Sequence, residues 1–123
     1  MTIDEAVLRE RRRAHRLARR IIRFLKEEFN WSIRFTDLKD ERVLRRLGFE
    51  KREIVGLTDW EEETLLIDPS YDDFFGVLIH ECLHAIYPDA EEEEVLARER
   101  IVRVHLTNDQ AADLLMWTAR RLV

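Results

Sequence analysis

Cysteine, proline and glycine are all scarce in this chain of 123 residues, which contains 1 Cys, 2 Pro and 3 Gly. The single cysteine, Cys82, excludes an internal disulfide bond and is typical of a protein kept in a reducing compartment. So few Gly and Pro residues argue against long disordered linkers. We therefore expect residues 1–123 to form a single cytoplasmic domain, large enough to bury a core.

Long hydrophobic runs are also missing. The longest apolar run covers residues 74–79, far short of the roughly 20 residues that a membrane-spanning helix needs. The first residues are acidic and lack the apolar centre of a secretion signal. We therefore expect neither a membrane segment nor a signal peptide, and a composition with 46% hydrophobic and 38% charged residues indicates a soluble globular protein.

What the chain does contain is a histidine pair inside its most apolar stretch, residues 74–86. A helix that is hydrophobic on all sides belongs in a core, where ionisable groups are costly. His80 and His84 share one face of such a helix, and Glu81 lies about 100° around from His80. This H-E-x-x-H pattern predicts two zinc ligands and a general base. The alternative is a pair of satisfied core histidines beside a buried Glu.

A catalytic zinc site needs a third protein ligand, which we expect from the acidic residues after the motif. Counting back by three and four from Val95, which we expect to face inward, gives Glu92 and Glu91. We choose Glu92, which also lies on one helical line with Glu99, and place Glu91 second. One alternative is that Glu92 only completes a capping box with Asp89. Another is that the run of glutamates is there because acidic side chains are favoured at helix N-termini.

The order of helical and strand patterns predicts an α+β domain with an N-terminal helix, a small three-stranded mixed sheet, the motif helix and two C-terminal helices. The expected helices cover residues 3–28, 37–47 (closed by Gly48), 71–87, 90–106 and 111–122, and the expected strands cover residues 31–35, 53–57 and 64–67. The expected N-cap residues are Thr2, Ser70, Asp89 and Thr107, with capping boxes completed by Glu5 and Gln110.

Charge is unevenly spread along the chain. Residues 1–52 hold 16 Lys and Arg against 9 Asp and Glu, whereas residues 53–123 hold 5 against 17. The first helix carries an arginine face made of Arg9, Arg12, Arg13, Arg16, Arg19, Arg20 and Arg23. Such a face can bind nucleic acid, but we favour a solvated face that pairs with the acidic second half of the chain. His15 is expected to be exposed and without a role.

The motif and the element order resemble the gluzincin class of zinc metallopeptidases, and most of all its minimal single-domain members, the minigluzincins. The resemblance rests on the H-E-C-L-H sequence of residues 80–84 and on the Pro-Asp and acidic residues within 88–95. It implies a zincin-like fold in which His80 and His84 hold the zinc, Glu81 is the base and an acidic residue near Glu92 completes the ligand set.

The same resemblance implies where a substrate lies. Members of this class place a substrate strand along the sheet edge nearest the metal. Some minimal members are latent, with a terminal segment over the cleft, and here residues 107–123 are the candidate for that role.

The favoured function is zinc-dependent hydrolysis of a peptide or an unfolded protein, with Glu81 as general base on a metal-activated water. Tyr71, Tyr87 and His105 are candidates for a second oxyanion donor. A non-catalytic zinc-binding module for regulation or interaction is the second hypothesis, and His105 as a fourth ligand would indicate it. The third is a DNA-associated metalloprotease similar to SprT-like proteins, with the arginine face on nucleic acid. A helical interaction protein without metal is the fourth.

Overall fold

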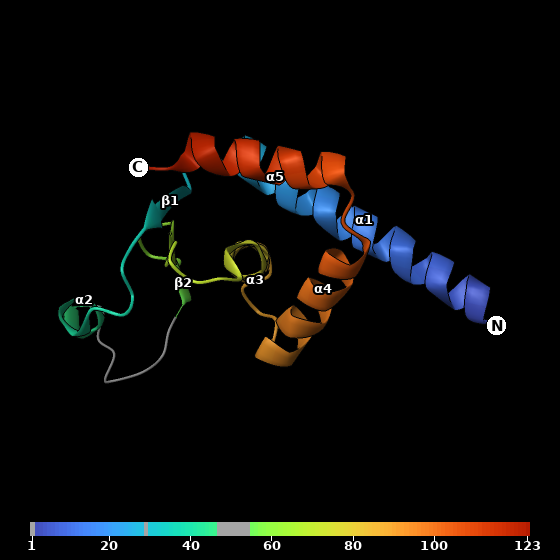
Figure 1. Ribbon diagram of the computed structural model, residues 1–123, viewed down its shortest axis with the longest axis horizontal. Helices are drawn as coiled ribbons and strands as arrows, with labels where there is room; N and C mark the ends of the chain where they lie inside the picture. The colour runs from blue at the N-terminus through green and yellow to red at the C-terminus, as the bar shows by residue number, and fades with distance from the viewer. Residues whose placement is uncertain (1, 29, 47–54) are drawn as a thin grey trace.

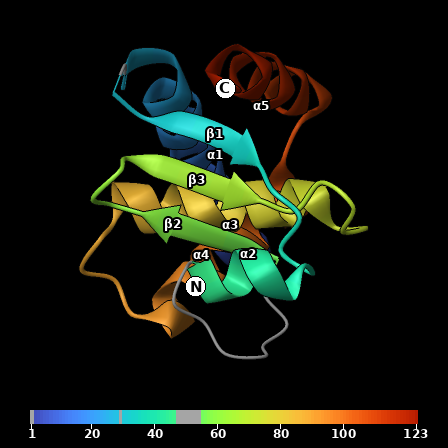
Figure 2. The ribbon, with the colours of Figure 1, turned by 90° about the vertical axis from the view of Figure 1, so that its left-hand side faces the viewer.

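The structure is a computed structural model that describes residues 2–28, 30–46 and 55–123. A three-stranded sheet lies over one side of α3. Other sides of α3 are covered by α1 and α4, and α5 runs beside α1 (Figure 2). In chain order the elements are α1 (Ile3–Glu27), β1 (Ser32–Phe35), α2 (Glu41–Arg46), β2 (Gly56–Asp59), β3 (Thr64–Ile67), α3 (Phe74–Ile86), α4 (Glu92–His105) and α5 (Asn108–Arg121). The predicted α+β class is therefore confirmed.

β3 is the central strand of the sheet, between β1 and β2. β1 runs parallel to β3, and β2 runs antiparallel to it. The last three side chains of β3 are buried, and Leu65 and Ile67 are fully enclosed. The predicted mixed sheet of three strands is confirmed.

β2 begins later than predicted. The expected strand covered residues 53–57, of which 53 and 54 lie outside the described residues, whereas β2 spans Gly56–Asp59. Gly and Asp are poor strand formers, so the sequence pattern hid this segment. Pairing with β3 sets the register instead, with Thr58 opposite Leu65. Gly48, the expected end of α2, also lies outside the described residues.

α1 begins at the predicted capping box of Thr2 and Glu5. Its first turns extend beyond the other elements (Figure 1), and the apolar Val7 in this part of the helix is 44% exposed. The arginine face lies in solvent apart from the partly buried Arg20. Among the described residues, however, none of its arginines forms an ion pair with the second half of the chain, so the expected pairing is wrong.

The N-cap of α3 is Asp73 and not the predicted Ser70. The Asp73 carboxylate accepts the backbone N–H of Gly76, whereas the Ser70 hydroxyl donates to Asp68. Both residues are good N-caps, and the earlier one is held by the turn after β3. α3 has 13 residues, and no helix in the described part of the chain is long and apolar enough to cross a membrane.

α4 also begins later than predicted. Its N-cap is Glu91, whose side chain makes no capping hydrogen bond. Asp89 therefore does not cap the helix, and the alternative capping box of Asp89 with Glu92 does not form. The Glu92 side chain is left free for a different contact.

α5 begins at the predicted capping box of Thr107 and Gln110. It packs against α1 and β1, and the backbone N–H of Val123 donates to the carbonyl of Ile33 at 3.0 Å. In the part of the chain that the structure describes, α5 does not pack against α3 or β2. The expectation that residues 107–123 cover the cleft is therefore wrong, because this helix completes the core on the opposite side.

Truncating the buried face of α5 tests that placement. Leu114 is fully buried, so Leu114→Ala is expected to lower the free energy of unfolding by about 2–5 kcal/mol, measured by urea denaturation. Leu115, next to it and 50% exposed, is the control, and Leu115→Ala should change stability by less than about 0.5 kcal/mol. Equal effects of the two substitutions would contradict the docking of α5.

Candidate metal centre

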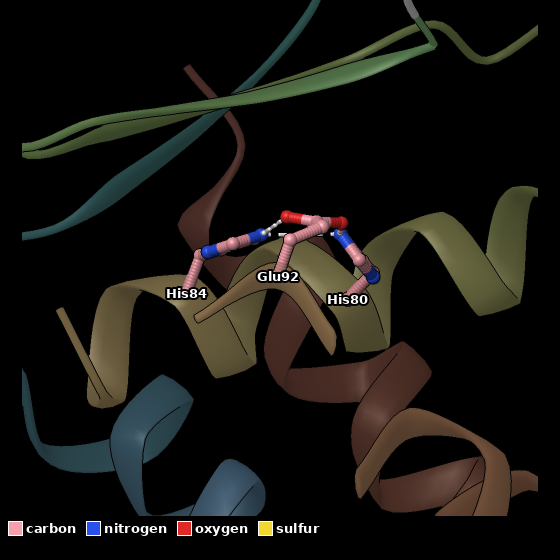
Figure 3. A group of neighbouring side chains, drawn as sticks. All are labelled: His80, His84 and Glu92. Carbon is pink, nitrogen blue, oxygen red and sulfur yellow. Dashed lines mark hydrogen bonds and ion pairs between the residues drawn. The ribbon is translucent and has the colours of Figure 1, made fainter. Parts of the chain in front are cut away.

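α3 and the first turn of α4 together build the predicted site. His80 and His84 lie one turn apart on α3, and Glu92 is the first residue of α4. Pro88 lies between the two helices, so the chain turns and brings α4 back alongside α3. Figure 3 shows both imidazoles pointing from α3 toward the Glu92 carboxylate, which lies between them.

The three side chains converge closely. The Nε2 atom of His80 is 2.8 Å from Glu92 Oε1, and Nε2 of His84 is 2.7 Å from Glu92 Oε2. The two Nε2 atoms are 3.1 Å apart. The predicted set of His80, His84 and Glu92 is therefore brought together, and it could hold a metal ion.

Glu99 contacts the second ring nitrogen of His80. Its Oε1 atom is 2.7 Å from Nδ1 of His80. A carboxylate accepts hydrogen bonds, so Nδ1 carries a hydrogen, and in a neutral ring Nε2 is then the nitrogen available to a metal ion. This second contact on a ligating histidine is typical of metal sites, where it orients the ring and raises its basicity.

Arg103 holds this carboxylate in place. Its Nη1 atom lies 3.2 Å from Glu99 Oε2 and 2.9 Å from Asp73 Oδ2, the N-cap of α3. A chain of charged hydrogen bonds therefore runs from the start of α3 through α4 to the ring of His80. Sequence analysis missed this role of Glu99, although its position seven residues after Glu92 placed both on one helical line.

The donor set fits a divalent cation. Nε2 of a neutral His80 and the Glu92 oxygen are both electron-pair donors, and they are directed at one place, as the ligands of a cation are. A tetrahedral site with metal–ligand distances of about 2.0–2.1 Å separates its ligand atoms by about 3.3 Å. The observed separations of 2.7, 2.8 and 3.1 Å need only a small outward shift.

Glu81 lies beside the ligands but is not one of them. Its side chain is buried, and the Thr58 hydroxyl contacts both Glu81 Oε1, at 2.9 Å, and the Glu81 carbonyl, at 3.1 Å. Burial raises the pKa of Glu81, while the Thr58 hydrogen bond and the nearby histidines lower it in part. A carboxylate with a raised pKa is suited to accept a proton and to return it.

Gly56 makes room for Glu81. A Cβ at this position would lie 2.7 Å from Val77 Cγ1 and 2.9 Å from Glu81 Oε2, closer than real carbon atoms approach. The start of β2 can therefore lie against α3 because Gly56 has no side chain. The missing side chain of Gly56 therefore explains both the weak strand signal at this residue and the space that the Glu81 carboxylate occupies.

A cleft of about 340 Å³ opens at this point, lined in part by Gly56, Tyr71, His80, Glu81 and Glu99. Tyr71 is thus the one of the three candidate oxyanion donors that lies at the cleft.

The other two candidates lie elsewhere. Tyr87 packs under the guanidinium of Arg98 at 4.4 Å, and His105 donates to Glu10 at 2.8 Å. His105 is therefore not a fourth ligand. His15 is not idle, because its Nε2 donates to the carbonyl of His105 at 3.3 Å and holds the end of α4.

Cys82 is a packing residue. It is fully buried within the core, and burial, followed by the nearby Glu81 carboxylate, raises the pKa of its thiol. A thiol in such surroundings stays protonated and unreactive.

Comparison of the chain with protein-family models, with curated proteins and with solved structures finds no match. The arrangement of His80, Glu81, His84 and Glu92 therefore has to be interpreted through its own chemistry.

The contact between Glu99 and His80 predicts a measurable effect on metal affinity. Glu99→Ala removes the acceptor of Nδ1, so we expect zinc affinity to fall about 10–100-fold in competition with a chromogenic chelator. Glu93, exposed on the same helix, is the matched control, and Glu93→Ala should bind zinc as the unmodified chain does. Unchanged affinity in Glu99→Ala would show that Glu99 does not support the ligand.

Proposed function

We propose that this protein is a zinc-dependent metallopeptidase with a zincin-like fold of the gluzincin type. The observation that carries the proposal is the convergence of His80, His84 and Glu92 on one point, with the buried Glu81 next in sequence to His80 and lining the same cleft as His80. Two imidazoles and one carboxylate are a donor set that zinc accepts in catalytic sites.

Each side chain has a distinct task in this proposal. His80, His84 and Glu92 hold the ion, and Glu99 keeps the lone pair of His80 directed at it. Bound zinc supplies a Lewis acid and lowers the pKa of a water molecule. Glu81 takes a proton at its carboxylate and passes it to the leaving amine, and Thr58 fixes the orientation of that carboxylate.

The substrate we propose is a peptide or an unfolded protein segment, extended beside β2. Among the described strands, β2 pairs with β3 alone, and it is the strand that packs closest to the motif helix. An edge strand offers backbone donors and acceptors to an added strand. Gly56 lies both on this edge strand and in the lining of the cleft, so an added strand would pass Glu81.

Two features support a catalytic site over a closed structural one. In the described part of the chain, the ligand group has three members, and a structural zinc site takes four protein ligands. The Glu92 side chain is 59% exposed, so the group is open to solvent. Since α5 packs elsewhere, it does not make the enzyme latent.

Replacing the base tests the proposal directly. Glu81→Gln keeps the shape of the side chain but cannot accept the proton, so we expect cleavage of casein to fall about 10²–10⁴-fold. Zinc content, measured by atomic emission, should stay at one equivalent in both proteins. Zinc with no cleavage in either protein would replace the proposal with the non-catalytic zinc-binding module, and no zinc after reconstitution would refute the site itself.

Tyr71 is expected to stabilise the oxyanion of the reaction because it is the candidate donor that lines the cleft. Tyr71→Phe removes one hydroxyl, and loss of such a donor costs about 10²–10³ in kcat. Tyr87→Phe, which removes a hydroxyl outside the cleft, should leave kcat unchanged. A Tyr71→Phe protein with full kcat would exclude this role.

A further inference from the structure

A second cavity, of about 300 Å³, lies on another side of α4, between that helix, α1 and the end of α3. Its lining consists of Arg13, Arg16, Leu17, Tyr87 and Arg98. Figure 1 shows α4 running up to α1, which brings residues distant in sequence together. None of the lining residues belongs to the proposed metal centre.

The charges in this cavity are poorly balanced. Arg13 and Arg16 form no ion pair or hydrogen bond within the described part of the chain. Arg98 is 3.8 Å from Glu94 through Nη2, a weak contact, and its Nη1 atom is buried without a hydrogen-bond partner. An unpaired donor on a charged group is costly, and a ligand that accepts from the Arg98 guanidinium would lower that cost.

One ring contact restrains the guanidinium of Arg98. Tyr87 lies under the Arg98 guanidinium at 4.4 Å and limits its freedom. Arg13 and Arg16 are three residues apart on α1, so they share one face of that helix. Guanidinium groups bind the oxygens of phosphate in pairs of parallel hydrogen bonds, and three of them suit a doubly charged oxyanion.

We propose that this arginine pocket binds a single phosphate group, either free phosphate or the phosphate of a phosphorylated small molecule or side chain. The pocket is concave and has Leu17 and Tyr87 among its walls, so it selects one compact group. This distinguishes it from the rest of the arginine face, which lies open on α1.

Calorimetric titration with inorganic phosphate, at constant ionic strength set by chloride, tests the proposal. We expect saturable binding of one phosphate per chain. Arg98→Gln and Arg16→Gln should each weaken it about tenfold or more, because each removes a charge-assisted hydrogen bond. Arg23→Gln is the matched control, since Arg23 lies on the same helix face outside the pocket, and it should bind phosphate normally.

The variants distinguish the pocket from the metal centre and from the open arginine face. Phosphate bound at the metal centre would be unaffected by Arg98→Gln, and that result would overturn the proposal. Equal weakening by Arg23→Gln would also overturn it and assign the effect to the whole arginine face. An oligonucleotide without a terminal phosphate extends this comparison. Steeply salt-dependent binding that Arg98→Gln and Arg23→Gln weaken equally would indicate a nucleic-acid surface. Phosphoserine binding more tightly than phosphate would identify a phosphorylated ligand.

Discussion

Burying α3 requires apolar surface on several sides at once, because its side chains are apolar around most of the helix. The sheet covers one side, and α1 and α4 cover others. Three polar residues on such a helix must therefore be paired within the protein. All three have partners. Thr58 contacts Glu81, and Glu99 contacts His80. Glu92 contacts both histidines.

The network behind the histidines explains how so small a protein can hold a defined geometry. Arg103 connects the N-cap of α3 to Glu99, and Glu99 connects to the ring of His80. Each link is a charged hydrogen bond, stronger than a neutral one. The position of His80 is thus set from the start of α3 and from α4, and not by its own rotamer alone.

Local spacing was enough to predict part of this structure. The separation of His80 and His84 places them on one face in any helix, and Glu92 followed from the inward position of Val95. The parts that failed depend on contacts between distant segments. The register of β2 is set by β3, and Asp73 and Ser70 are equally good caps until the turn occupies Ser70. Glu99 reaches His80 only when α4 is packed against α3. The arginine pocket likewise forms only when α4 is packed against α1.

The third ligand of the metal group comes from a different helix than the first two, and this has a thermodynamic consequence. An ion bound by His80, His84 and Glu92 would tie α4 to α3, so ion binding and helix docking must strengthen each other by the same free energy. Metal affinity would then report how firmly α4 is seated. Any ligand or substitution that shifts α4 would change it, even from the side that faces α1.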